Sequence, residues 1–193
     1  MSTETLTTIT RAADLARVPW RNGQGMTTEI ALGGAPDDFI WRVSLAEVAR
    51  SGDFSAFPGI DRIIMLIEGS AMTLHLPDHT QVLRRDEPFA FDGGAPVRCV
   101  VDQPTRDLNV MTRRGEAQAT LDVRVLAEGD APVVVPASGV AVLVVLEGSV
   151  RLTAAGETTL GVGDVAVTAE EVTASGAGRL ALARIVLAEV TVQ

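Results

Sequence analysis

The chain has 193 residues, of which 47% are apolar and 21% are charged. That composition supplies ample material for a packed core and excludes a disordered chain. With 25 acidic and 16 basic residues the net charge is −9, so we expect neither nucleic acid nor an anionic membrane surface as a partner. Every basic residue is Arg, and the absence of Lys excludes Schiff-base, pyridoxal-phosphate and P-loop chemistry.

The N-terminal 20 residues contain no apolar segment of signal-peptide length, and no apolar run approaches the roughly 20 residues that span a bilayer. We therefore expect a cytoplasmic protein without a membrane partner. The single Cys99 has no second cysteine with which to form an internal disulfide, and its valine neighbours indicate a buried thiol.

Short segments rich in β-branched residues, separated by Gly, Pro and Asp, recur along the whole chain. A helical turn over residues 11–17, capped by Thr10 and ended by Pro19, is the clearest helix signal. Residues 44–50 have some helical character, but the alternation of Trp41, Val43 and Leu45 favours a strand, as does the β-branched end of the last segment. Strands are expected at residues 40–45, 62–68, 72–76, 97–101, 108–112, 121–126, 133–135, 140–147, 150–153, 158–162, 164–167 and 180–192.

An internal repeat relates the two halves of the chain. Residues 63–70 (IIMLIEGS) match residues 142–149 (VLVVLEGS) at an offset of 79, and in both copies Glu-Gly-Ser separates two strand-like segments. A turn, a strand and an acidic turn follow, the last containing Asp86 in one copy and Gly163-Asp164 in the other. The shared order indicates one supersecondary unit used twice.

This pattern resembles that of the cupins, small antiparallel jelly-roll barrels, two of which in one chain form a bicupin. The resemblance implies an all-β bicupin with little helix, with barrels at residues 1–118 and 119–193 that together make one compact unit. Cupins usually bind a metal through His, His and Glu ahead of the Glu-Gly turn and a third His after the Gly-Asp turn. Those stretches lack His here, and His75 and His79 flank one hairpin turn, so we expect neither a metal nor another cofactor.

Polar and aromatic residues are concentrated in residues 20–29 (WRNGQGMTTE), and the segment has two interpretations. It is either a surface turn before an edge strand, or a loop whose backbone N–H groups and Asn22 amide face a small polar ligand, with Trp20 as an apolar wall. The candidate residues in this segment are Trp20, Asn22, Gly23, Gly25, Thr27 and Glu29.

Two further segments carry candidate binding residues. Alternation places Arg42 and Ser44 on one face of a strand, where the planar Arg fork suits a carboxylate. In residues 54–62 (FSAFPGIDR), either Asp61 or Arg62 points into the barrel and needs a partner there, or the two pair with each other at the rim. The same alternation puts Asn109 on one face of a strand with Asp107 and Met111.

At these residues the chain resembles the HutD/Ves family. The resemblance rests on WRNGQGMTTEI, FIWRVSLAEV, FSAFPGIDR and DLNVMTRRG and covers residues 15 to 115 well. It implies a metal-free bicupin linked to histidine utilisation, where HutD-type proteins temper pathway output by binding a small metabolite such as urocanate, formiminoglutamate or formate, whereas Ves-type proteins are associated with cold or stress response. By resemblance the ligand-binding positions are Trp20, Asn22, Gly23, Gly25, Thr27, Glu29, Arg42, Ser44, Phe57, Gly59, Asp61, Arg62 and Asn109.

The leading hypothesis is a regulatory protein that binds a small organic carboxylate. Arg42 or Arg62 would clamp the carboxylate, Asn22 and Ser44 would orient it, and Trp20 would cover it. One alternative is a metal-free isomerase or hydrolase with Glu29 or Asp61 as general base, and another is a structural barrel that binds a partner. The oligomeric state is open, with a homodimer as one outcome, because barrels with exposed edges commonly dimerise.

Overall fold

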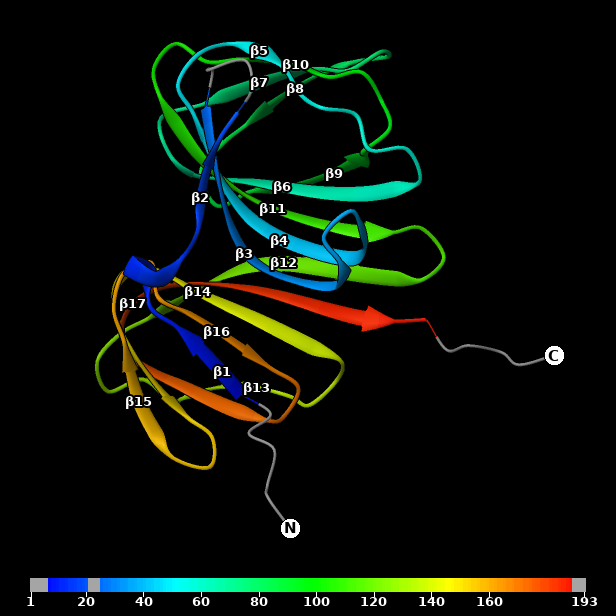
Figure 1. Ribbon diagram of the computed structural model, residues 1–193. Helices are drawn as coiled ribbons and strands as arrows, with labels where there is room; N and C mark the ends of the chain where they lie inside the picture. Colours follow the sequence, from blue (N-terminus) through cyan, green and yellow to red (C-terminus); the bar gives the residue numbers. More distant parts are fainter. Residues whose placement is uncertain (1–6, 21–24, 189–193) are drawn as a thin grey trace, which may run out of the picture. The chain divides into compact units, whose positions relative to one another are not determined.

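The computed structural model describes residues 7–20 and 25–188, which divide into two compact units (Figure 1). Of the described residues, the first unit comprises 16–20, 25–121 and 187–188, and the second comprises 7–15 and 122–186. The strand pairs whose register is known are antiparallel, and the regular helical structure of the described residues is one 3-10 turn, η1 (Ala12–Asp14). The all-β fold expected from the sequence is confirmed.

The first unit is built from two sheets. The six-stranded sheet has the order β2-β3-β4-β11-β6-β9 and the four-stranded sheet the order β5-β10-β7-β8. Apolar residues of both sheets, such as Ile64 and Leu74, pack into one core between them. The strands are β2 (Arg17–Pro19), β3 (Gly25–Ala35), β4 (Asp38–Val48), β5 (Gly52–Asp53), β6 (Ile60–Glu68), β7 (Met72–His75), β8 (Thr80–Leu83), β9 (Pro88–Asp92), β10 (Arg98–Val100) and β11 (Thr105–Arg113).

The second unit is built on one seven-stranded sheet. Its main order is β1-β16-β14-β17-β12, with β13 paired to β17 and β15 paired to β14. Both halves of the long β14 contribute to a single apolar core, for example through Leu143 and Leu152. The strands are β1 (Thr7–Thr10), β12 (Ala117–Leu126), β13 (Val133–Val135), β14 (Val140–Thr153), β15 (Glu157–Leu160), β16 (Val165–Thr168) and β17 (Val172–Leu187).

Three differences from the sequence-based expectation concern the first strand, the unit boundary and the helical turn. β1 pairs with β16, with Thr7 opposite Thr168, so the first described strand belongs to the second unit. The expected boundary between residues 118 and 119 falls inside β12. The expected helical turn over residues 11–17 is limited to η1, and Arg11 rather than Thr10 precedes it without a side-chain cap.

Strand pairing confirms the internal repeat. β6 pairs with β9 and β7 pairs with β8, just as the two halves of β14 pair with β16 and β15. The offset between the copies falls from 79 at Leu66 and Val145 to 78 at Met72 and Val150, because β14 runs on through its Glu-Gly-Ser where β6 ends. It falls to 77 at Leu83 and Leu160, because the hairpin loop is one residue shorter.

The Glu-Gly pair of each copy places a glycine in the left-handed region. Gly69 has φ 108° and Gly148 has φ 73°. After the hairpin, Asp86 has φ 66° and its N–H donates to the Leu66 carbonyl at 2.9 Å, whereas Gly163 has φ 83° and donates to the Val145 carbonyl at 2.8 Å. Asp86 therefore occupies the position of Gly163, which shows that a conformation typical of glycine is held here by an aspartate.

A substitution at Gly148 tests this backbone requirement. A Cβ at Gly148 would lie 2.1 Å from the Ala177 carbonyl oxygen, in addition to the positive φ. We expect Gly148→Ala to lower the free energy of unfolding by more than about 2 kcal/mol in urea titrations. Gly129→Ala is the matched control, since Gly129 has φ 88° but no atom within 4 Å of its Cβ position, and about 1 kcal/mol is expected there. Equal losses in both variants would contradict the close backbone contact.

Candidate functional site

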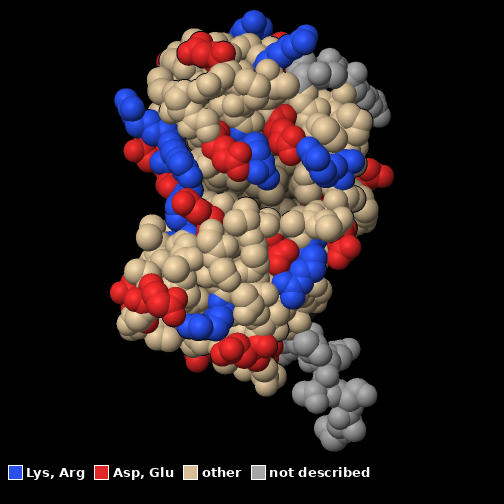
Figure 2. All heavy atoms as spheres, turned by 90° about the vertical axis from the view of Figure 1, so that its left-hand side faces the viewer, with Lys and Arg blue, Asp and Glu red and all other residues tan. Residues whose placement is uncertain are grey.

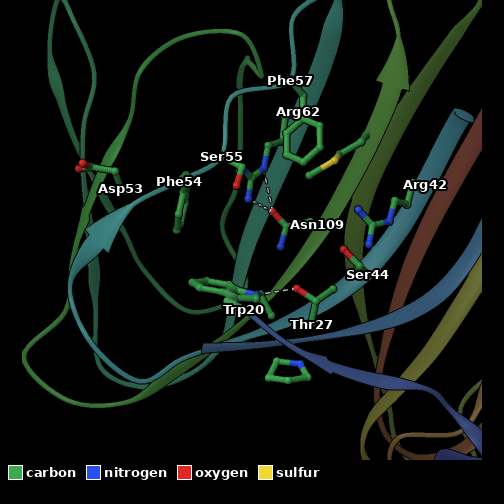
Figure 3. Close-up of a pocket in the computed structure, with 13 residues that line it drawn as sticks. Trp20, Thr27, Arg42, Ser44, Asp53, Phe54, Ser55, Phe57, Arg62 and Asn109 are labelled. Atoms are coloured by element: carbon green, nitrogen blue, oxygen red, sulfur yellow. Dashed lines mark hydrogen bonds between the residues drawn. The ribbon is translucent and has the colours of Figure 1, made fainter. Parts of the chain in front are cut away.

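A cavity of about 480 Å³ opens in the first unit (Figure 3). In Figure 3, Arg62 and Asn109 lie between Phe54 on one side and Arg42 with Ser44 on the other. Trp20 and Thr27 close a third side. The lining residues are Pro19, Trp20, Thr27, Arg42, Ser44, Ala46, Asp53, Phe54, Ser55, Phe57, Arg62, Asn109 and Met111.

The register of three neighbouring strands sets the polar side of this cavity. Met111 of β11 lies opposite Arg42 of β4 on one side and Arg62 of β6 on the other. Two residues along β11, Asn109 lies opposite Ser44 of β4. Because alternate residues of a strand share a face, these five side chains come to one face of the sheet. The sequence-based expectation that Arg42 and Ser44 share a face is confirmed.

Arg62 is the buried cation of the cavity, with 7% of its surface exposed. Its Nε and Nη2 donate to Asn109 Oδ1 at 2.9 and 2.6 Å. The guanidinium carbon lies 4.7 Å from the centre of the Phe54 ring and 5.3 Å from that of Phe91, so two aromatic faces stabilise the charge. Burial nevertheless lowers the pKa of Arg62 to about 10, against the opposing effect of Asp107.

Asp107 lies two residues before Asn109 on β11 and is fully buried. Its Oδ1 accepts a hydrogen bond from Asn109 Nδ2 at 2.5 Å, whereas its Oδ2 has no hydrogen-bond partner in the part of the chain that the structure describes. Burial raises the pKa of Asp107 to about 6, and the charge of Arg62 and the Asn109 hydrogen bond only partly offset that effect. The three residues form a chain in which Asn109 joins a carboxyl group to a guanidinium.

Arg42 provides a second, more accessible guanidinium. Its Nε donates to Glu29 Oε2 at 3.1 Å, and its side chain is 22% exposed. Its two terminal nitrogens make no hydrogen bond to the described residues, and Figure 3 shows the group beside Ser44. A carboxylate placed between Arg42 and Arg62 would meet donors from both.

Trp20 is fixed at the cavity wall by two contacts. Its Nε1 donates to Thr27 Oγ1 at 2.7 Å. A Cβ at Gly25 would lie 3.0 Å from the Trp20 ring and 2.3 Å from the Glu47 carbonyl oxygen. Glycine at position 25 therefore allows the indole to pack against the start of β3, which gives this residue a packing role.

The structure brings together seven of the residues singled out by the sequence. Those that line the cavity are Trp20, Thr27, Arg42, Ser44, Phe57, Arg62 and Asn109. Glu29 lies beside it through its ion pair with Arg42, and Gly25 supports Trp20. Asn22 and Gly23 lie outside the described residues.

Gly59 and Asp61 lie elsewhere. Gly59 has φ 77° and lines a separate surface groove. Asp61 is half exposed and pairs with Arg114 at 2.7 Å, so the alternative in which Asp61 and Arg62 pair at the rim is wrong. The physical reason is alternation along β6, which sends Asp61 outward when Arg62 points inward.

Sequence reasoning missed several lining residues. Ala46 follows Ser44 by two positions on the same face of β4, and this alternation was a usable signal. Phe54 and Ser55 stand in a loop without periodicity, and Asp53 in the two-residue strand β5, so no local pattern indicated which way they point. Phe91, which contacts Arg62 but is not one of the lining residues, was missed because it reaches Arg62 only through the pairing of β6 with β9.

The residues of this cavity do not suit a metal ion. Its lining includes one carboxylate, Asp53, with no His or Cys. His75 and His79 lie at the β7–β8 hairpin, where they share hydrogen bonds with Thr80 and Asp78. Within residues 7–20 and 25–188, no group of three His, Cys, Asp or Glu is arranged to hold a metal.

The surface and the helical content limit other kinds of site. On the face shown in Figure 2, Arg side chains lie among Asp and Glu side chains rather than in one basic patch. Among the described residues, no helix has the length and apolar character that a membrane crossing requires.

Comparison with known proteins gives consistent matches. The sequence model of the HutD family matches residues 12–182. Protein Ves of Citrobacter koseri is 41% identical over 117 residues, which are 57% of this chain and 61% of that protein. The match thus spans about three fifths of the length of this relative.

Solved structures resemble this one over nearly the whole chain. HutD from Pseudomonas fluorescens SBW25, solved in a formate condition, is 27% identical, with a TM-score of 0.80 and coverage of 95% of this chain and 100% of that one. A conserved protein of unknown function from Pseudomonas aeruginosa PAO1 is 30% identical, with a TM-score of 0.83 over 93% and 98% of the two chains. A cupin 2 conserved barrel domain protein from Leptotrichia buccalis, 12% identical with a TM-score of 0.54 over 89% and 92%, shares the fold.

The buried carboxyl group predicts an unusual dependence of stability on pH. The pKa of Asp107 is about 6 in the folded chain and 3.8 for an ordinary aspartate, so between these values the folded state binds more protons than the unfolded state. The free energy of unfolding therefore falls as the pH rises from about 4 to about 6, by about 3 kcal/mol from this residue.

Urea titrations across this pH range test the expectation. Asp107→Asn removes the titrating group and keeps the acceptor for Asn109, so the fall should disappear and the variant should be the more stable protein at pH 7. Asp61→Asn, an exposed control, should retain the fall. The same slope in Asp107→Asn and in the unchanged chain would contradict the assignment.

Proposed function

We propose that this chain, which belongs to the HutD family, binds a small organic carboxylate in the cavity of its first unit and thereby acts as a regulator in histidine utilisation. The family supplies the link to histidine utilisation. The observation that carries the proposal is the placement of Arg42 and Arg62 on either side of Met111, facing one cavity.

Cavity size and chemistry support a ligand of metabolite size. A volume of about 480 Å³ lies in the range typical of small-molecule sites. Arg42 offers its terminal nitrogens, Ser44 offers a hydroxyl, and Trp20, Phe54 and Phe57 supply apolar walls. Such a site suits a molecule with one carboxylate and a flat or short apolar part, and urocanate, formiminoglutamate, histidine, glutamate and formate are the acids to test.

The proposed regulatory role rests on the effect of binding on the free ligand and on the surface of the protein. A protein that holds a metabolite lowers its free concentration, or presents a ligand-dependent surface to a protein partner. The net charge of −9 argues against a direct contact with DNA. The proposal therefore assigns regulation to sequestration of the carboxylate or to a protein contact.

The geometry gives less support to a metal-free enzyme. Of the two candidate general bases, Asp61 lies outside the cavity in an ion pair with Arg114, and Glu29 is held by Arg42. Asp53, the carboxylate of the cavity lining, is exposed and forms an ion pair with Arg98 at 3.5 Å. General base catalysis needs a carboxylate within hydrogen-bond reach of the substrate. Binding without reaction is the function that this arrangement favours.

Substitution of Arg42 tests the proposal. With the five acids as probes, calorimetric titration should find at least one that binds, and Arg42→Gln should weaken that binding by 10-fold or more because a charge-assisted hydrogen bond contributes about 1.5–3 kcal/mol. Arg114→Gln is the matched control, since Arg114 bonds Asp61 and Asp92 outside the cavity. Binding that is unchanged in Arg42→Gln, or absent for all five acids, would contradict the proposed site.

A further inference from the structure

Asp107 is a buried carboxyl group on β11, two residues from the cavity-lining Asn109. Its neighbours across the sheet are apolar, with Ala46 opposite on β4 and Leu66 opposite on β6. Among the described residues, its hydrogen bond comes from Asn109 Nδ2, and Asn109 Oδ1 in turn accepts from Arg62. The side-chain amide of Asn109 therefore separates the carboxyl group from the Arg62 guanidinium that lines the cavity. The negative charge of Asp107 acts on that guanidinium.

Few charges surround Asp107. Arg62 of β6 is the cation whose charge acts on it, and Cys99 of β10 is a thiol whose pKa burial raises to about 12, so that it is neutral near pH 7. The positive charge of Arg42 on β4 contributes to the lowered pKa of Arg62, and Arg42 itself forms an ion pair with Glu29 of β3. Among the described residues one buried cation thus stands against one buried carboxyl group.

We propose that the cavity takes up a proton on Asp107 when it binds a carboxylate. This inference rests on the proposed function. A ligand carboxylate beside Arg62 adds a second anion to a low-dielectric region that holds one buried cation, and two anions sharing a site disfavour the ionised form of one of them. Hydrogen bonds from the arginines stabilise the ionised form of the ligand carboxylate, whereas Oδ2 of Asp107 has no such partner among the described residues. Asp107 is therefore the group that becomes neutral.

Protonation leaves the binding geometry intact. Oδ1 of Asp107 is the acceptor for Asn109, whereas Oδ2 has no partner among the described residues. A proton on Oδ2 leaves Oδ1 as a carbonyl-type acceptor, so Asn109 keeps its orientation and its Oδ1 still faces Arg62. A buried neutral hydroxyl without a partner costs less than a buried anionic oxygen without one. Protonation of Asp107 therefore removes its negative charge and leaves the orientation of Asn109 unchanged.

Proton uptake predicts that the affinity falls as the pH rises. Formate is the probe, because its single carboxyl group is ionised throughout pH 5.5–8, and binding is followed by tryptophan fluorescence at constant ionic strength. We expect the Kd for formate to rise by up to 10-fold per pH unit above the range in which free Asp107 titrates, because one proton is linked to each ligand bound. Asp107→Asn should bind with an affinity that varies little with pH and should bind more tightly than the unchanged chain at pH 8.

Asp53→Asn is the matched control, since Asp53 is an exposed carboxylate at the same cavity and should leave the pH dependence in place. Should Asp107→Asn fail to fold, calorimetry on the unchanged chain at pH 7 in two zwitterionic buffers of different ionisation enthalpy measures the proton uptake directly. Formate binding without proton uptake, or an equal pH slope in Asp107→Asn, would overturn this inference while leaving the proposed function standing. Absence of binding by formate and by every other acid of the set would contradict both.

Discussion

The burial of the Arg62 guanidinium is the constraint around which the first unit is organised. A charged group removed from water is costly unless it is paired and hydrogen-bonded. Asn109 supplies the acceptor, Phe54 and Phe91 supply aromatic faces, and Asp107 supplies an opposing charge. These partners come from three different parts of the chain, namely β11, β9 and the loop before β6, so the cation is stable only once the sheet register and that loop are both in place.

In the second unit, the positions of the repeat that are equivalent to Arg62 and its β11 partners are apolar. At the offset of 79, Arg62 corresponds to Ala141, and strand pairing makes Leu182 and Leu180 the equivalents of Asn109 and Asp107. All three belong to the apolar core of the second unit. The repeat thus preserves the strand order, while three residue differences between the copies separate a polar cavity wall from a packed apolar core.

Local alternation was enough to predict part of this arrangement. It placed Arg42 with Ser44 and Asn109 with Asp107, because residues two apart on a strand share a face whatever the strand pairs with. It left Asp61 and Arg62 as equal candidates, since which face turns inward depends on the neighbouring strands. Three other features depend on residues far away in the sequence. They are the contact of Phe91 with Arg62, the pairing of β1 with β16, and the positive φ of Asp86. The glycine-rich β3 was also missed, because its strand conformation comes from pairing with β4 rather than from its own composition.

The chain as a whole is acidic, whereas its cavity presents two Arg side chains, and this difference in charge bears on which ligand would be selected. A net charge of −9 gives no long-range attraction for an anion. In the proposed site, attraction for a carboxylate would therefore arise at contact with Arg42 and Arg62, where salt screens the interaction less than it does at the surface. With a buried carboxyl group one amide away from Arg62, each further negative charge on the ligand raises the cost of entry. This electrostatic arrangement favours small acids of low charge over polyanions, and it does so through the residues that hold Arg62 in place.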